Sequence, residues 1–233
     1  MAKYIRTLTV TYDAEICYKE IPLFRGAVLH SMGDRANLLY HNHIGNNSFR
    51  YSYPLIQYKR LGGKAAIVCI EEGADVIGQF LSESTNSMKI GDREVKCNTD
   101  RIVPAKILMQ TWKSPFSYQI YRWLPLNKVN YKKYQETEGV IERVILLEAI
   151  LKGNLLAMLK GLGIYLEDEL KVKITNISES YILHNKGIAL MAFNADFNCN
   201  LSIPDNVGIG KNASIGYGVI HRKKKEDQQK ERE

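Results

Sequence analysis

The chain has 233 residues, enough for one large domain or two small domains that each bury a core. Hydrophobic residues make up 45% and charged residues 24%, which is ordinary for a soluble globular protein. The net charge of +7 favours an acidic partner, but the excess is spread along the chain. This distribution favours a protein that binds a phosphate backbone at a local site. It argues against a protein whose whole surface is strongly basic.

Cysteine usage and hydropathy exclude several classes of protein. The four cysteines lie far apart without a Cys-x-x-Cys pair, so we expect no metal site. Two of them lie inside apolar runs, which predicts buried thiols in a reducing compartment. The first six residues lack the apolar core of a signal peptide. The most apolar window, Val144 to Leu162, contains Glu148, Lys152 and Lys160, so it is not a membrane span. We therefore expect a cytoplasmic protein that needs no cofactor.

The first half of the chain alternates between strand and helix patterns. Residues 7–12 alternate threonines with larger residues, as in a strand, and Pro22 suits the first turn of a helix that follows. Residues 49–59 and 64–71 are β-rich runs joined by a Gly-Gly hairpin signal. A short helix at 74–81 and strands near 87–90 and 102–109 follow. This order predicts a ferredoxin-like βαββαβ domain over residues 1–112, with a boundary at Lys113-Ser114-Pro115.

The second half predicts a modified copy of the same domain over residues 113–222. Its strongest element is a long helix from Gly139 to Leu162. Strands are expected near 118–124, 170–174, 188–197 and 217–222. Residues 223–233 read as a charged tail whose basic start is a candidate RNA contact. The predicted fold class is α+β, with two tandem ferredoxin-like domains.

A glycine-rich stretch lies between residues 206 and 220. Gly208 and Gly210 precede Lys211, and Gly216 and Gly218 follow it. Glycine permits positive φ and close backbone approach, so such a loop can turn several N–H groups toward one anion. Its spacing is neither that of a Walker A loop nor that of a Rossmann turn. The ordinary interpretation, a hairpin between two strands, remains open.

A histidine-rich segment lies in the first half. His41 and His43 stand two residues apart, so an extended backbone directs both side chains to one side. Histidine suits proton transfer in metal-free RNA cleavage because its ordinary pKa lies near neutrality, and Tyr51 is a candidate donor. Without further context, such loop histidines are usually solvated surface residues. A metal-dependent HNH nuclease fits poorly, because no further ligand follows at a suitable spacing.

Basic and aromatic residues interleave at Phe49-Arg50-Tyr51 and at Tyr58-Lys59-Arg60. Such interleaving can stack bases while holding phosphates, which makes Arg50 and Lys59 candidate RNA contacts. Tyrosine is also an ordinary residue of strands, so many of the fourteen tyrosines are expected in the core or at its rim.

Two of these stretches resemble the repeat-RNA-processing endoribonucleases of CRISPR systems, within the superfamily of RNA-binding proteins built from ferredoxin-like domains. The Gly208–Gly218 loop before a last strand resembles the glycine-rich loop of that family. His41-Asn42-His43, followed by Tyr53-Pro54-Leu55-Ile56-Gln57-Tyr58-Lys59, resembles the N-terminal domain of one branch. Because the stretches lie in opposite halves, the resemblance spans nearly the whole chain.

The resemblance implies cleavage of CRISPR repeat RNA by 2′-OH attack, with 2′,3′-cyclic phosphate and 5′-OH ends. His41 and His43 would share the roles of general base and acid, and Tyr51 would orient or donate. The family site often includes a lysine near the histidines, but this chain has none between Lys19 and Lys59. The cation must then come from Arg25, Arg35 or Arg50. We favour Arg35, because it lies on the predicted helix end that leads into the histidine loop.

Repeat RNA is the expected partner of the chain. Other CRISPR proteins and a second copy of the chain are further candidate partners. Two alternatives stay open: a non-catalytic RNA-binding subunit of the same superfamily, and an unrelated enzyme that uses the glycine loop for a nucleotide or phosphorylated metabolite.

Overall fold

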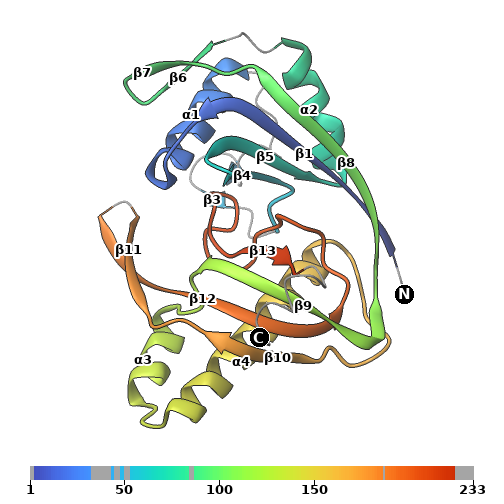
Figure 1. Cartoon of the computed structure of the whole chain (residues 1–233), viewed down its shortest axis with the longest axis vertical. Helices are drawn as coiled ribbons and strands as arrows, with labels where there is room; N and C mark the ends of the chain where they lie inside the picture. The colour runs from blue at the N-terminus through green and yellow to red at the C-terminus, as the bar shows by residue number, and fades with distance from the viewer. Residues whose placement is uncertain are drawn as a thin grey trace, which may run out of the picture. The chain divides into compact units, whose positions relative to one another are not determined.

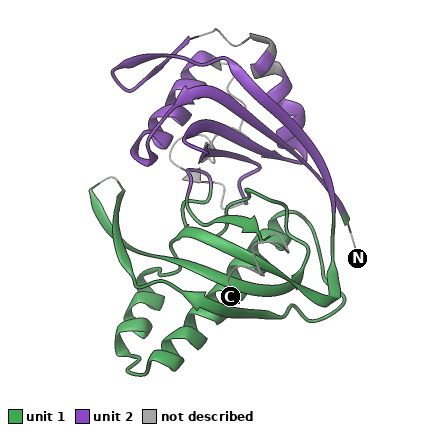
Figure 2. Ribbon diagram, in the orientation of Figure 1, with its two compact units in different colours: residues 1–3, 108–213, 217–233 green, residues 4–107, 214–216 purple. Residues whose placement is uncertain are grey.

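The computed structural model describes residues 3–32, 43–44, 48–49, 53–83, 87–185 and 187–223. The chain divides into two compact units, coloured separately in Figure 2. Unit 2 comprises residues 4–107 together with 214–216, and unit 1 comprises residues 1–3, 108–213 and 217–233. The main division thus falls five residues before the predicted boundary. Lys113–Pro115, predicted to separate the domains, instead lie inside a continuous strand.

Unit 2 contains a four-stranded sheet in the order β4-β5-β1-β8 (Figure 1). Its elements are β1 (Lys3–Glu15), the 3-10 helix η1 (Tyr18–Glu20), α1 (Ile21–Met32), β2 (His43–Ile44), β3 (Ser48–Phe49), β4 (Ile56–Leu61), β5 (Lys64–Ile70), α2 (Glu72–Glu83), β6 (Ser87–Ile90), β7 (Arg93–Lys96) and β8 (Thr99–Met109). The four long strands and two helices follow the ferredoxin-like βαββαβ order. The prediction for the first domain is confirmed.

The core of unit 2 forms where α1 meets the sheet. The ring of Phe24 on α1 makes edge-on contacts with Tyr12 of β1, centroids 5.8 Å apart, and with Tyr58 of β4, 5.9 Å apart. All three side chains are fully buried. The turn between β4 and β5 contains Gly62 and Gly63, both at positive φ, as the hairpin signal predicted.

Unit 1 contains a sheet in the order β10-β12-β9-β13, with β11 paired to β12. Its elements are β9 (Thr111–Trp123), α3 (Lys128–Glu136), α4 (Val140–Gly161), β10 (Val172–Ile177), β11 (Tyr181–Asn185), β12 (Ile188–Leu201) and β13 (Val219–Arg222). This is again the ferredoxin-like strand order, but residues 202–218 between β12 and β13 form loop and turn instead of a second helix. The predicted modification of the second domain is therefore the glycine-rich loop itself.

Helix α4 supplies the core of unit 1. Its leucines at 147, 151 and 155 repeat every four residues and, with Met158 and Leu159, are buried. Gly163, at φ +67°, ends the helix while the Ile164 N–H donates to the Leu159 carbonyl at 2.9 Å. Helix α3 and strand β11 were not predicted. Every residue of α3 is at least partly exposed, so no apolar periodicity marks it.

Three of the four cysteines are buried, as the sequence predicts for thiols in apolar runs, and one is exposed. Cys69, Cys97 and Cys199 are buried free thiols, and Cys17 is exposed. Burial raises the pKa of Cys97 to about 12 and that of Cys199 to about 11, so these thiols stay protonated near neutrality.

Candidate RNA-binding loop and catalytic segment

The two arms of the glycine-rich loop pair with each other. Residues 206–209 run antiparallel to residues 218–220: the Asn206 N–H donates to the Ile220 carbonyl at 2.8 Å, and the Ile209 N–H donates to the Gly218 carbonyl at 2.9 Å. Gly208 and Val219 form a bridge between these hydrogen bonds. A Cβ on Gly218 would lie 2.0 Å from the Ile209 carbonyl oxygen. Gly218 is therefore required by the pairing of the arms.

Gly210 closes the first arm over the core of unit 1. Its φ is +76°, and a Cβ there would lie 2.7 Å from Asn154 Oδ1. This amide oxygen accepts a hydrogen bond from Trp123 Nε1 at 2.9 Å, and Trp123 is fully buried. The sequence contains a signal for this contact, since Asn154 is a polar residue three positions after Leu151 and next to Leu155, on the buried side of α4.

The tip of the loop, residues 214–216, belongs to unit 2. The Tyr58 N–H of β4 donates to the Ser214 carbonyl at 2.8 Å, and Tyr58 forms a parallel bridge with Ile215. Gly216 has φ +82°, and a Cβ there would lie 2.5 Å from Cδ1 of Ile21, the first residue of α1. The glycine thus permits a close approach to α1.

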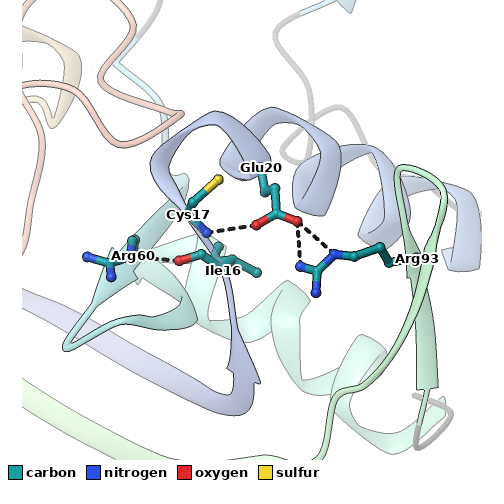
Figure 3. Close-up of polar contacts among 5 residues, drawn as sticks. All are labelled: Ile16, Cys17, Glu20, Arg60 and Arg93. Carbon is teal, nitrogen blue, oxygen red and sulfur yellow. Dashed lines mark hydrogen bonds and ion pairs between the residues drawn. The ribbon is translucent and has the colours of Figure 1, made fainter.

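A polar network positions the start of α1 (Figure 3). The Glu20 carboxylate accepts hydrogen bonds from the Cys17 N–H at 2.8 Å and from Nε of Arg93 at 3.0 Å, and a second guanidinium nitrogen of Arg93 also contacts it. The Cys17 N–H, more than Arg93, lowers the pKa of Glu20. Arg60 Nε donates to the Ile16 carbonyl at 2.6 Å. These contacts tie the residues that lead into Ile21 to β4 and β7.

The second arm of the loop is also fixed by Arg122, near the end of β9. The Gly218 N–H donates to the Arg122 carbonyl at 3.1 Å, and the Arg122 guanidinium lies over the Tyr217 ring, 5.0 Å from its centroid. Arg122 itself has φ +52°, and its N–H donates to Asn194 Oδ1 at 2.9 Å.

Most of the loop is therefore committed to internal contacts. Gly208, Gly216 and Gly218 are buried, whereas Gly210 and Lys211 are exposed and Asn212, at φ +60°, is partly exposed. The segment that can face a ligand is thus 210–212, and Lys211 is its cation.

The predicted catalytic segment is described only in part. His43 lies in β2, where its backbone pairs opposite Phe49 of β3. The run predicted as one strand from residue 49 to 59 is instead divided between β3 and β4. Arg35, His41, Arg50 and Tyr51 lie outside the described residues.

Lys59 was predicted to contact RNA at the protein surface, but the structure places it elsewhere. Tyr58 points toward α1, so alternation along β4 directs Lys59 toward the opposite face of the sheet. There its side chain is 0% exposed. Burial lowers the pKa of Lys59 to about 7. A buried amine does not present a cation to RNA, so the prediction of Lys59 as an RNA contact is wrong.

Within the described ranges, no group of three or more His, Cys, Asp or Glu side chains is arranged to hold a metal ion. No helix in this part of the chain is long and apolar enough to cross a membrane.

Models of two known domain families match the two halves of the chain, in the same order. A model of the Cas6b N-terminal domain matches residues 3–107, and a model of the Cas6b C-terminal domain matches residues 110–223. The chain belongs to the Cas6b family. The resemblance to CRISPR repeat-RNA-processing endoribonucleases, inferred from the His-x-His stretch and the glycine-rich loop, is thus confirmed at the level of the family.

Solved Cas6b structures share the fold of this Cas6b family member. One crystal structure of Cas6b has a TM-score of 0.84 at 26% identity and covers 95% of this chain and 100% of that chain. A crystal structure of the CRISPR RNA processing endoribonuclease Cas6b has a TM-score of 0.72 at 23% identity, with the same coverage. The uncharacterized protein MJ0978 of Methanocaldococcus jannaschii is 36% identical over 100 residues, which are 43% of this chain and 67% of that protein.

Proposed function

We propose that this chain is a metal-independent endoribonuclease that cleaves CRISPR repeat RNA. The observation that carries the proposal is the match to both Cas6b domains in their natural order over residues 3–107 and 110–223. The exposed Lys211 in the glycine-rich loop supports it, because a lysine between backbone turns can meet an RNA phosphate. Repeat RNA is the proposed substrate and partner.

The proposed reaction proceeds within the RNA strand. One of His41 and His43 takes the proton of a 2′-hydroxyl, whose oxygen then attacks the adjacent phosphorus. The bond from phosphorus to the 5′-oxygen breaks, and the other histidine protonates that oxygen. The products are a 2′,3′-cyclic phosphate and a 5′-hydroxyl. Tyr51 orients or donates, and Arg35 stabilises the charge on the pentavalent phosphorus.

The proposed RNA contacts combine the loop and one arginine. Lys211 supplies an ionic contact, and the exposed backbone of Gly210 next to it is proposed to meet a phosphate. Arg50 is proposed as a second contact. Gly216 and Gly218 are buried, so their proposed role is to maintain the conformation of the loop.

Labelled repeat RNA incubated with the chain in excess EDTA tests this proposal. We expect cleavage at one position, with cyclic phosphate ends, and no cleavage when a 2′-deoxy nucleotide replaces the ribose just upstream of the cut. A requirement for Mg²⁺, or cleavage of the deoxy substrate, would refute the mechanism. Tight binding without cleavage would instead identify a non-catalytic RNA-binding subunit. Absence of both binding and cleavage would favour an enzyme acting on a nucleotide or phosphorylated metabolite.

A further inference from the structure

The first part of β9 departs from regular pairing with β12. Thr111 pairs with Leu201 and Phe116 pairs with Cys199, so four residues of β9 lie opposite one residue of β12. These four residues, 112–115, are all exposed. Extra residues in one strand form a bulge, which re-aims side chains and is frequent next to functional sites. This bulge therefore presents its side chains to solvent at one end of β9.

Trp112 is the aromatic residue of this bulge, and it is 42% exposed. Hydrogen bonds fix the orientation of its ring. Trp112 Nε1 donates to Ser202 Oγ at 3.0 Å, and this buried hydroxyl donates to the Leu108 carbonyl at 2.5 Å. Because the indole N–H already has its acceptor within the protein, the ring offers a ligand its flat surface for stacking.

Phe116 joins the indole to the guanidinium of Arg222, the last residue of β13. The Trp112 and Phe116 rings meet edge-on with centroids 6.2 Å apart, and the Arg222 guanidinium lies over the Phe116 ring, 4.2 Å from its centroid. Arg222 is exposed, and across the described part of the chain its guanidinium forms no hydrogen bond or ion pair. The carboxylate of Asp205 accepts from the backbone N–H of Arg222, at 3.0 Å. Stacking on Phe116 thus holds the guanidinium flat and leaves its donors available to a ligand.

We propose that Trp112 and Arg222 form a binding site for a nucleotide of single-stranded RNA, apart from the glycine-rich loop. The base stacks on the indole of Trp112, and the guanidinium of Arg222 binds an adjacent phosphate. Lys113, exposed in the same bulge, is the second cation of the site. Aromatic stacking beside cations is the usual way in which proteins hold single-stranded nucleic acid. This inference rests on the proposed function, because it names a further contact of the RNA substrate.

The groups at this site match a nucleotide better than they match a protein surface. A phosphate can accept two hydrogen bonds from the planar guanidinium of Arg222, and a base offers a flat π surface to the indole of Trp112. Two exposed cations on a chain of net charge +7 favour an anionic ligand. Stacking and phosphate contacts need no particular base, so we expect the site to hold the strand without reading its sequence.

Tryptophan fluorescence of the full chain tests the stacking directly, because the chain has two tryptophans and the other, Trp123, is fully buried. Repeat RNA with a 2′-deoxy nucleotide just upstream of the cut serves as the probe, so that binding is measured without cleavage. We expect binding to quench the emission of the parent protein. Trp112→Phe should remove the quenching although the RNA still binds, since phenylalanine also stacks. RNA binding by the parent protein without quenching, or equal quenching in Trp112→Phe, would overturn the proposal.

Filter binding of the same RNA measures what each group contributes. Trp112→Ala should weaken binding by roughly 5- to 150-fold, the range typical of base–aromatic stacking. Arg222→Gln should lower the slope of log affinity against log salt by about 0.7. The matched control is Tyr131→Ala, which removes a 46% exposed aromatic ring from α3. Urea unfolding checks that each variant stays folded.

The outcomes separate this site from the proposed reaction. If Trp112→Ala and Tyr131→Ala bind RNA as tightly as the parent protein, the stacking site is refuted and the proposed cleavage is not affected. If binding quenches Trp112 but unmodified repeat RNA is not cleaved, the site stands and the proposed reaction is refuted. Absence of RNA binding by the parent protein would overturn both.

Discussion

The backbone N–H of Tyr58 donates a hydrogen bond to the carbonyl oxygen of Ser214, 2.8 Å away. Tyr58 lies in β4, the outer strand of its sheet, where backbone groups would otherwise lack a neighbouring strand. The tip of the glycine-rich loop adds a short parallel extension at this edge, with Ile215 opposite Tyr58. Residues 214–216 therefore belong to unit 2 although the rest of the loop belongs to unit 1.

The first prediction concerns the glycine at this tip. Gly216→Ala should lower the free energy of unfolding by about 1–3 kcal/mol, because φ +82° strains a residue with a side chain. The new Cβ would also lie 2.5 Å from Ile21 Cδ1. Urea unfolding of the single variant, and of Gly216→Ala combined with Ile21→Val, measures this effect. The double variant should recover part of the loss, since valine lacks the Cδ1 methyl.

Gly62→Ala is the matched control for that experiment. Gly62 also has positive φ, +55°, in unit 2, but nothing lies within 4 Å of an added Cβ. Gly62→Ala should lower the free energy of unfolding through backbone strain alone, without a steric contact. Adding Ile21→Val should therefore not restore stability to this variant. If the two glycine variants lose equal stability and Ile21→Val rescues neither, the approach to Ile21 does not constrain the loop.

The architecture was predictable where the pattern is local. Single elements could be predicted from local patterns. These patterns are the alternation in β1, Pro22 at the start of α1 and the leucine repeat of α4. The order of these elements then determines the ferredoxin-like sheets. Helix α3 escaped prediction because it buries no residue and carries no apolar stripe.

The site was less predictable, because its contacts join distant parts of the sequence. Glycine spacing indicated close approach but not its target: Gly210 meets Asn154 and Gly216 meets Ile21, neither of which lies near the loop in sequence. Likewise, Tyr58-Lys59-Arg60 resembles a basic–aromatic surface. In the structure the first two of these residues are fully buried. Their burial depends on contacts in the folded protein, which the order of residues along β4 does not reveal.

The second prediction concerns Lys211 and the salt dependence of RNA binding. Lys211→Ala should remove about one ionic contact and lower the slope of log affinity against log salt by roughly 0.7–0.9. Filter binding across a salt series measures the slope. Lys133→Ala on α3 removes another exposed lysine and serves as the control. Equal slopes for the Lys211 variant and the parent protein would assign the loop a purely structural role.

The third prediction concerns the histidine pair. Replacing His41 and His43 together by alanine should lower the single-turnover rate constant by roughly 10²–10⁴-fold, the range typical of general acid–base groups. RNA affinity should change little, because the proposed role of both imidazoles is proton transfer and the proposed phosphate contacts come from other residues, Lys211 and Arg50 among them. His184→Ala on β11 removes an exposed histidine elsewhere and should cleave normally. Parent-like cleavage by the double variant would assign catalysis to other residues.

The fourth prediction concerns the buried amine of Lys59. Burial lowers its pKa from an ordinary value of 10.5 to about 7. Between these values the unfolded chain binds more protons than the folded chain, so this group makes stability rise with pH across that window. Below about pH 7 both states are protonated, and the full cost of the buried charge is present.

Lys59→Met should therefore stabilise the protein most at pH 6, with a gain that shrinks toward pH 10. Urea unfolding of both proteins at several pH values measures the difference, in which groups common to both cancel. The salt dependence of RNA binding should not change, since the ammonium group is not exposed. A stability difference that stays constant from pH 6 to 10 would mean that Lys59 keeps an ordinary pKa. Its proton would then be accommodated by partners inside unit 2, and the buried amine would carry no pH-dependent cost.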